Sequence, residues 1–232
     1  MNLDLIVALD FPDINSAKKM VEQLGDEVGF YKIGLEFMMS GDFFHLVSWL
    51  KSKEKKVFAD LKLYDISQTV GRAIKNLGQY DIDIITIHSA NQSIMEAAAA
   101  NKRNSKIIAV TVLTNLDQID LYKMGFQQNI TIEELVQKKT DLVLRSGIDG
   151  VVASGNQAQN LRAKFGDDFL IVSPGIRLEK IANDDQKQIC DVKTAITNGS
   201  NHLVVGRPIT QNNNPKIAAY HFQQEISKAL II

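Results

Sequence analysis

The sequence is poor in the residues that disulfide-bonded, metal-clustering and membrane-embedded proteins need. It contains one cysteine, Cys190, which cannot form an internal disulfide and is too few for a metal–thiolate cluster. No apolar run approaches the roughly 20 residues of a membrane-spanning helix, and the first apolar segment carries Asp4 where a signal peptide would be basic. These absences argue against secretion and membrane insertion, and they predict a cytoplasmic protein.

An excess of charge of one sign is also missing. The chain of 232 residues has 26 basic and 27 acidic side chains, so its formal net charge is −1. Proteins that coat nucleic acid or lie on membrane surfaces need a positive excess, so neither partner is expected. Hydrophobic residues make up 45% of the chain and charged residues 23%, which is enough apolar material for a real core. No linker-like or low-complexity stretch divides the sequence, and we expect one domain over residues 1–232.

What the sequence does contain is a repeating alternation of two kinds of segment. Short apolar runs rich in β-branched residues alternate with longer segments in which apolar residues recur at helical spacing. The predicted strands are Leu3–Leu9, Phe30–Ile33, Val57–Ala59, Ile82–Ile87, Ile107–Val112, Gly150–Ala153, Phe169–Val172 and Leu203–Val205. Two predicted helix faces are Ala17, Met20, Val21 and Leu24, and Val70, Ala73, Ile74 and Leu77.

The number and spacing of these segments indicate the fold. Thr131 and Glu134 have the form of a capping box, and Pro215 suits the first turn of the last helix. Eight strand–helix units of about 29 residues each match a compact barrel, and near-continuous apolar strands suit a parallel sheet covered on both faces. A doubly wound open sheet is the rival fold, but no glycine-rich dinucleotide fingerprint follows the first strand. We predict an α/β protein made of a single-domain (β/α)8 TIM barrel.

Charged residues fall at the ends of the first three predicted strands. Barrel enzymes carry their chemistry on this edge, where Asp10, Lys32, Asp60 and Lys62 would meet. Residues two apart in an extended strand point the same way, so Asp60 and Lys62 should project together. Two acids alternating with two lysines keep one another ionised, which makes such an array an electrostatic device. The alternative is a rim salt bridge that merely ties the third strand to its neighbours.

Two glycine–arginine pairs follow the seventh and eighth predicted strands. They are Gly175 with Arg177, and Gly206 with Arg207. Glycine exposes a backbone N–H and arginine supplies a forked cationic donor, and these two loops are where barrels most often hold phosphate. Either pair alone is weak evidence, because such a pair is more often a surface turn than a ligand site. Together, on neighbouring strands, they favour a phosphorylated ligand.

Several segments of the sequence resemble those of a known family. One segment matches the Asp-x-Lys-x-x-Asp signature of the orotidine 5′-phosphate decarboxylases, namely Asp60-Leu61-Lys62-Leu63-Tyr64-Asp65-Ile66. Further segments resemble the bacterial branch, in order and at suitable intervals: Val7-Ala8-Leu9-Asp10, Lys32-Ile33-Gly34, Val110-Thr111-Val112-Leu113-Thr114, Pro174-Gly175-Ile176-Arg177, Asp185-Gln186 and Val205-Gly206-Arg207-Pro208-Ile209-Thr210. The resemblance spans nearly the whole chain.

The resemblance implies a homodimeric (β/α)8 barrel that converts orotidine 5′-monophosphate to uridine 5′-monophosphate and carbon dioxide. This is the last step of de novo pyrimidine nucleotide synthesis, and it needs no metal or other cofactor. The implied mechanism is electrostatic stabilisation of a carbanion at C6 of the ring, followed by protonation of that carbon by Lys62. Asp60 would lie beside the departing carboxylate, and Lys32 would link Asp60 to the ribose.

The resemblance also assigns the remaining site residues. Asp10 would hold the ribose hydroxyls together with Lys32. Thr114 would contact the pyrimidine, although Asn115 stands where the family usually has serine. Catalytic Asp65, with Ile66 and Thr69, would reach into the partner subunit's site. The phosphate, or the loop that closes over it, would be bound by Arg177, Gln186, Gly206 and Arg207.

Two other functions stay open at this stage. The chain also resembles, in fold and motif, the hexulose-phosphate synthases and ketogulonate-phosphate decarboxylases, which use magnesium to hold an enediolate. The segments Pro174–Arg177 and Asp185-Gln186 fit the pyrimidine enzyme better. The second alternative is a catalytically silent nucleotide-binding barrel, which would bind uridine monophosphate without turning over the substrate.

Overall fold

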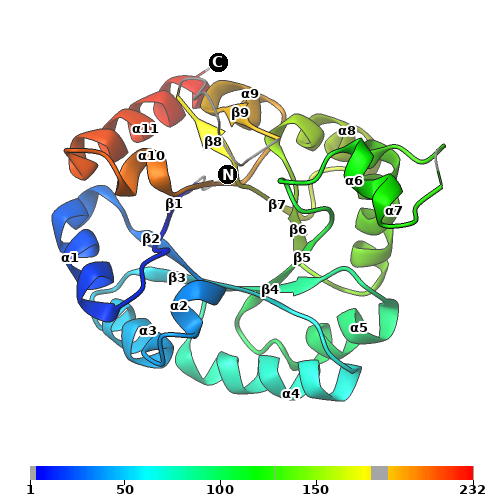
Figure 1. The fold of residues 1–232 in the computed structure, drawn as a ribbon, viewed down its shortest axis with the longest axis horizontal. Helices are drawn as coiled ribbons and strands as arrows, with labels where there is room; N and C mark the ends of the chain where they lie inside the picture. Colours follow the sequence, from blue (N-terminus) through cyan, green and yellow to red (C-terminus); the bar gives the residue numbers. More distant parts are fainter. Residues whose placement is uncertain (1–3, 128, 179–187, 232) are drawn as a thin grey trace.

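Eight parallel strands close into a barrel, as predicted (Figure 1). The structure is a computed structural model, and it describes residues 4–127, 129–178 and 188–231. Around the barrel the strand order is β1-β10-β7-β6-β5-β4-β3-β2. The barrel strands are β1 Asp4–Ala8, β2 Phe30–Gly34, β3 Lys56–Leu63, β4 Ile84–His88, β5 Lys106–Val110, β6 Gly150–Val152, β7 Leu170–Ser173 and β10 His202–Val205.

Helices form a ring around the outside of the barrel (Figure 1). The longer ones are α1 Ile14–Leu24, α3 Phe43–Ser52, α4 Ser67–Leu77, α5 Gln92–Asn101, α7 Ile132–Arg145, α8 Gly155–Phe165 and α11 Pro215–Leu230. Short helices lie at α2 Leu35–Met38, α6 Gln118–Lys123, α9 Val192–Thr197 and α10 Arg207–Thr210, with 3₁₀ turns η1 Gly25–Glu27 and η2 Gly78–Tyr80. Within the described residues, no helix is both long and apolar enough to cross a bilayer.

The strands differ from the predicted runs mainly in β3 and in one addition. The third run was expected to end at Ala59, whereas β3 continues through the charged motif to Leu63. A small parallel sheet, β8 Ile176–Arg177 with β9 Cys190–Asp191, was not predicted. Its two-residue strands are too short to give a periodic signal, and they pair only because the barrel brings distant segments together.

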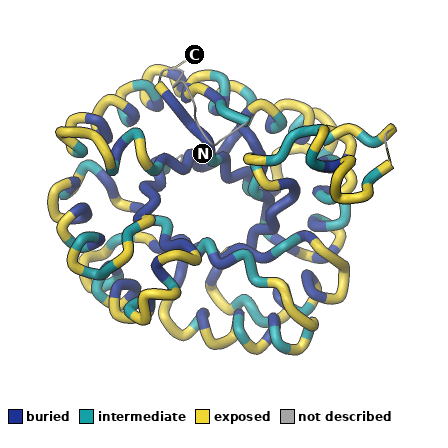
Figure 2. Tube along the Cα trace, viewed as in Figure 1, coloured by how far each residue is buried: buried dark blue, intermediate teal, exposed yellow. Residues whose placement is uncertain are grey.

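Strand side chains pack on both faces of the barrel wall. In β1, Leu5 and Val7 face the helices, while Ile6 and Ala8 belong to a separate cluster inside the barrel. That inner cluster consists of Ile6, Ala8, Phe30, Phe58, Ile84, Ile108, Val172 and Val204. Figure 2 shows the buried strand ring inside helices whose outer faces are exposed. The barrel interior is therefore a packed core below any pocket at its mouth.

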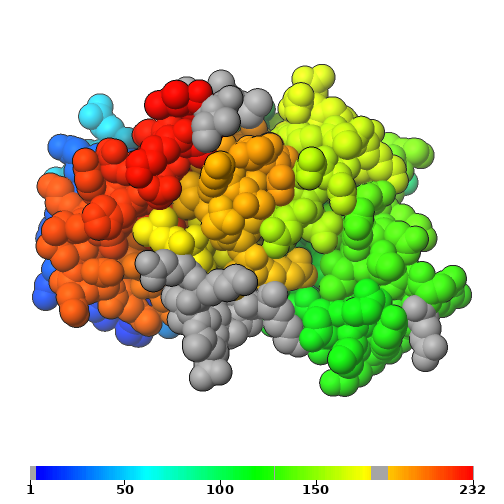
Figure 3. All heavy atoms as spheres, turned by 90° about the horizontal axis from the view of Figure 1, so that it is seen from above, coloured from blue at the N-terminus to red at the C-terminus, as the bar shows by residue number. Residues whose placement is uncertain are grey.

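The predicted helix faces and helix starts are found in the structure. The buried residues of α1 are the four predicted ones, and in α4 Gly71 is buried where Ala73 was expected. Thr131 and Glu134 form both halves of the capping box of α7, and Pro215 begins α11. Seen from above the view of Figure 1, α11 in orange-red to red, α9 in gold and α8 in yellow-green lie next to one another on the outer surface (Figure 3). The amphipathic pattern thus fixes how the helices cover the strands.

At the end where the strands begin, polar side chains tie neighbouring strands together. The residue just before β4, Asp83, accepts a hydrogen bond from the backbone N–H of Val57 in β3 at 2.8 Å. Asp149, just before β6, accepts from Ile107 N in β5 at 2.9 Å. The same contact joins the residue before β10 to β7, from Ile171 N to Asn201 Oδ1 at 2.7 Å. We call each of these contacts a strand bracket.

Each strand bracket also binds a cation from the helix that precedes the bracketed strand. Lys51 Nζ of α3 lies 2.9 Å from Asp83 Oδ2, and Lys102 Nζ, at the end of α5, lies 2.8 Å from Asp149 Oδ1. Arg162 of α8 donates to Asn201 Oδ1 at 2.6 Å. A helix, a strand and the next strand are thereby joined by one side chain, which fixes this end of the barrel.

Candidate active site

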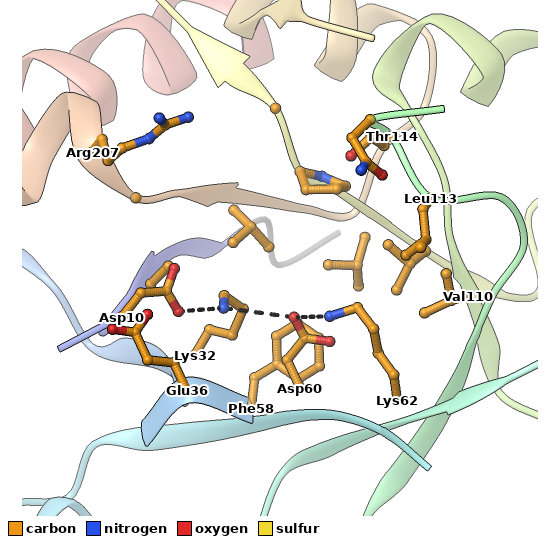
Figure 4. Close-up of a pocket in the computed structure, with 18 of the residues that line it drawn as sticks. Asp10, Lys32, Glu36, Phe58, Asp60, Lys62, Val110, Leu113, Thr114 and Arg207 are labelled. Carbon is orange, nitrogen blue, oxygen red and sulfur yellow. Dashed lines mark hydrogen bonds and ion pairs between the residues drawn. The ribbon is translucent and has the colours of Figure 1, made fainter. Parts of the chain in front are cut away.

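A cavity of about 570 Å³ opens at the carboxyl ends of the barrel strands. Its floor is the upper layer of the inner cluster, including Ala8, Phe58, Val172 and Val204. Charged side chains stand on its walls (Figure 4). The pocket therefore combines an apolar bottom, which excludes water, with a few convergent charges, the usual build of a small-molecule site.

The four predicted strand-end charges form one alternating row across this pocket (Figure 4). Lys32 Nζ lies 2.9 Å from Asp10 Oδ1 and 3.6 Å from Asp60 Oδ2. Lys62 Nζ lies 2.8 Å from the same Asp60 oxygen. The side chains of Lys32 and Asp60 are only 12% and 13% exposed. We call Asp10, Lys32, Asp60 and Lys62 the charge array.

The charge array keeps its buried members ionised. Burial alone would raise the pKa of Asp60, but Lys32 and Lys62, with hydrogen bonds from Lys62 and Thr86, hold it below its ordinary value. Burial alone would lower the pKa of Lys32, yet Asp60 and Asp10 together keep it above its ordinary value. A carboxylate and an ammonium are thus fixed at the pocket wall at neutral pH.

Gly34, at the end of β2, leaves room for this arrangement. A Cβ atom on residue 34 would lie 3.1 Å from Lys32 Nζ and 3.2 Å from Asp10 Oδ1. Contacts this short would force the lysine or the carboxylate to shift. Gly34 therefore lets the Asp10–Lys32 pair lie close to the backbone at the end of β2.

β3 is irregular where it carries the array. Ala59 pairs with Ile85 of β4, and Leu63 pairs with Ile87, so four steps along β3 match two along β4. Lys62 adopts φ +49°, in the left-handed region that side-chain-bearing residues rarely enter. Asp60 and Lys62 therefore come together as expected, but through this bulge rather than through regular alternation.

Arginine and backbone groups stand across the pocket from Lys62. Arg207 and Gly206, which follow β10, both line the cavity, and Figure 4 shows Arg207 on the side opposite Lys62. Arg177 lines it too but is buried at 6% exposure, with Nη1 donating to Ile176 O at 2.9 Å. Both predicted arginines thus line one pocket, and Arg207 lies across it from Lys62 (Figure 4).

The comparison with known proteins decides the family. Residues 4–222 match the Orotidine 5′-phosphate decarboxylase / HUMPS family. The chain belongs to this family. An orotidine 5′-phosphate decarboxylase from Methylococcus capsulatus is 51% identical over 223 residues, which cover 96% of this chain and 91% of that protein. One from Stenotrophomonas maltophilia is 43% identical over 227 residues, covering 97% and 93%.

The fold agrees with this assignment. The crystal structure of orotidine 5′-phosphate decarboxylase from Lactobacillus acidophilus superposes with a TM-score of 0.84 at 30% identity, covering 96% of this chain and 98% of that chain. The similarity therefore extends over the whole barrel.

The end of the family signature is not part of this chain's own pocket. Asp65, Ile66 and Thr69 follow β3 but do not line the cavity. Ile66 is 69% exposed, and the Asp65 carboxylate accepts a hydrogen bond from Ile66 N at 2.6 Å. Thr69 lies in the first turn of α4. Asp65 and Ile66 are therefore exposed beside the pocket, and Thr69 is half-buried.

The predicted pyrimidine-contacting loop lines the pocket. Thr114 and Asn115 both face the cavity after β5. Gln188 N donates to Thr114 O at 3.1 Å, which ties the segment before β9 to this loop. Gln186, the remaining predicted site residue, lies outside the described residues, as does Asp185.

Sequence reasoning missed several residues at this pocket. Glu36 of α2 and Gln211 line the cavity, and Phe58 forms part of its floor. Thr86 of β4 does not line it but hydrogen-bonds to Asp60 behind the wall. The available signal was one hydroxyl side chain inside the apolar run from Ile82 to Ile87. Because Thr86 contacts Asp60 from a neighbouring strand, no spacing in the sequence links the two residues.

Proposed function

We propose that this chain decarboxylates orotidine 5′-monophosphate to uridine 5′-monophosphate and carbon dioxide. It would act as a cytoplasmic carbon–carbon lyase at the end of de novo pyrimidine synthesis. The observation that carries the proposal is the charge array, in which Lys62 Nζ lies 2.8 Å from Asp60 Oδ2 at the mouth of the barrel. The relatives named orotidine 5′-phosphate decarboxylase support the choice of substrate.

The array suits the difficult step of this reaction. When the bond between C6 and the carboxylate breaks, the electron pair stays on C6 in an orbital in the plane of the ring. The ring carbonyls cannot accept that charge, so the site must stabilise it where it forms. The Lys62 ammonium, already oriented by Asp60, does so without solvent reorganisation. A proton then passes from Lys62 Nζ to C6, which completes the exchange of carbon dioxide for hydrogen.

Asp60 has a second effect in this mechanism. Its carboxylate is ionised and would lie beside the substrate carboxylate, so two like charges repel each other in the bound substrate. Departure of carbon dioxide removes one of those charges while Lys62 stays in place. The contact with Asp60 therefore becomes more favourable as the bond breaks, which is what lowers a barrier.

The remaining polar groups would hold the parts of the substrate that do not react. Asp10 and Lys32, joined at 2.9 Å, would bind the ribose hydroxyls, and Thr114 would contact the pyrimidine. The forked guanidinium of Arg207, the backbone at Gly206 and the neighbouring Arg177 would bind the phosphate. Binding energy from this remote group can still be realised in the transition state.

Two further roles come with the proposal. Asp65, Ile66 and Thr69 of one subunit would reach into the site of a second copy, so that two chains share each active site. The exposed apolar side chains Tyr64 and Ile66 at the mouth support such a contact, because a second copy would cover them. Gln186, which lies outside the described residues, would also bind the phosphate.

The test is a direct assay. Pure protein is mixed with orotidine 5′-monophosphate without added metal, and the ultraviolet absorbance of the ring is followed. Turnover that survives a chelator supports the cofactor-free mechanism. Loss of turnover with the chelator would favour the magnesium-dependent relatives. Tight binding of uridine monophosphate with no turnover at high enzyme concentration would instead favour a silent nucleotide-binding barrel.

A further inference from the structure

A hydroxyl group lies directly behind the lysine–aspartate pair. Thr86, in the middle of β4, is completely buried. Its Oγ1 donates to Asp60 Oδ1 at 3.0 Å and accepts from the backbone N–H of Lys62 at 2.9 Å. One side chain therefore touches both members of the pair, while it does not line the pocket itself.

The two hydrogen bonds divide the polar atoms of the pair without conflict. The Thr86 proton goes to Asp60 Oδ1 at 3.0 Å in preference to the Ala59 carbonyl at 3.4 Å, which leaves Asp60 Oδ2 for the ammonium groups of Lys62 and Lys32. A hydroxyl has one proton and two lone pairs, so it can donate to the carboxylate and accept from the amide together. A methyl group in its place would do neither.

Thr86 also occupies the place where the sheet ladder is interrupted. It lies between Ile85 and Ile87, the two β4 residues that flank the bulge in β3. With β3 displaced there, the Lys62 amide finds its acceptor in the Thr86 side chain. The same amide belongs to a residue in the left-handed region at φ +49°, a conformation that persists only when its surroundings hold it.

We propose that Thr86 is a positioning residue for the decarboxylation, which fixes the Asp60 carboxylate and the Lys62 backbone in their reactive arrangement. The inference rests on the proposed function, since it concerns the same site. Loss of the hydroxyl frees the Lys62 turn and one Asp60 oxygen together. Small displacements of reacting groups cost large factors in rate, so the effect falls on the chemical step rather than on substrate binding.

The experiment compares Thr86→Val, which keeps the shape and loses the hydroxyl, with Thr86→Ser, which keeps the hydroxyl. Thr140→Val is the matched control, because Thr140 is equally buried but donates to Val136 O within α7. Thr86→Val is expected to lower kcat about 10- to 100-fold with KM changed less than about threefold. Thr86→Ser should stay within about threefold of the parent, and Thr140→Val should leave kcat unchanged.

A pH profile separates positioning from general loss of structure. The hydrogen bond from Thr86 is one of the contacts that lower the pKa of Asp60. Without that bond the carboxylate protonates more readily, so the acid limb of kcat should move to higher pH in Thr86→Val and remain in place in Thr140→Val. An unshifted acid limb together with kcat within twofold of the parent would overturn the inference.

The remaining outcomes are also decisive. If Thr86→Val does not fold, Thr86→Ala compared with Thr86→Ser tests the same hydroxyl, and equal kcat in these two folded variants would refute the role. A crystal structure of the Val or Ala variant should show Lys62 Nζ more than 2.8 Å from Asp60 Oδ2, and an unchanged pair would refute it independently of activity. Absence of turnover in the parent protein refutes the proposed function instead.

Discussion

Gly29 holds the position before β2 that Asp83 holds before β4. The Gly29 carbonyl accepts a hydrogen bond from Lys56 N, the first residue of the following strand, just as the Asp83 carbonyl accepts from Lys106 N. The register that pairs Ile6 with Phe30 places Leu5 opposite Gly29. Three alternate strand pairs of the barrel thus carry a strand bracket, and the fourth equivalent position has a glycine with no side chain to form one.

Gly29→Asp is expected to complete the fourth bracket and stabilise the protein. A Cβ atom on residue 29 meets nothing within 4 Å, and its φ lies outside the left-handed region. A carboxylate there would accept from Leu5 N and would also restrict the unfolded chain. Together these effects should add about 1–2 kcal/mol to the free energy of unfolding, which raises Tm by roughly 2–8 °C.

Gly29→Ala is the control for this substitution, because it restricts the unfolded chain but supplies no acceptor. Thermal melts of the two variants should therefore rank Asp above Ala and Ala above the parent. Equal melting temperatures for Asp and Ala would mean that no fourth bracket forms.

Asp149→Asn should destabilise the protein in a pH-dependent way. Burial opposes the ionised form, but Lys102, the Ile107 amide and Lys106 hold the pKa of Asp149 below its ordinary value. Its stabilisation is present above the unfolded carboxyl's pKa of about 4 and is lost as pH falls through the lower folded pKa. Asparagine keeps an acceptor but loses the charge, at a cost of about 1–3 kcal/mol at pH 7. Urea unfolding should show this difference at pH 7 and a smaller one near pH 3; a constant difference would contradict the ionic contribution.

Lys62→Ala should remove nearly all activity while the barrel stays folded. The substitution takes away both the charge that stabilises the carbanion and the proton that quenches it, so kcat/KM should fall at least about 10⁴-fold. Lys228→Ala is the control, since Lys228 lies exposed on α11 and pairs with Glu225. Steady-state kinetics and circular dichroism of both variants check this, and a comparable loss in the control would refute the assigned role.

Mixing two inactive variants tests whether active sites are shared. If Lys62 of one subunit works with Asp65 of the other, a dimer of one Lys62→Ala chain and one Asp65→Asn chain contains one intact site. Random reassortment makes half of the dimers mixed, so about a quarter of the parent activity should return. The measurement is turnover after the two inactive proteins are unfolded and refolded together. No recovery, with mixed dimers demonstrated, would mean that each chain builds its own site.

Local patterns in the sequence are sufficient for the barrel. Each strand is an apolar run, each long helix carries a buried stripe such as Ala17 and Leu24, and the order of elements leaves few topologies. Strand ends then converge by geometry alone, which is why the four members of the charge array could be named before any coordinates.

Contacts between strands could not be predicted from the sequence. The bulge in β3 depends on how Ala59 and Leu63 pair with β4, and so does the left-handed conformation of Lys62. Both properties depend on two strands at once, so the hydrophobic periodicity of a single strand or helix cannot predict them. The strand brackets could not be predicted for a similar reason. Each joins three elements through a single side chain, and the residues next to it in the sequence form no motif.

The brackets sit where the strands begin, whereas the charge array sits where they end. A randomised library confined to the residues just before each strand should therefore yield variants that differ in heat resistance yet share one turnover number. Randomising the rim of the mouth should have the opposite outcome, altering which nucleotide is accepted at an unchanged melting temperature.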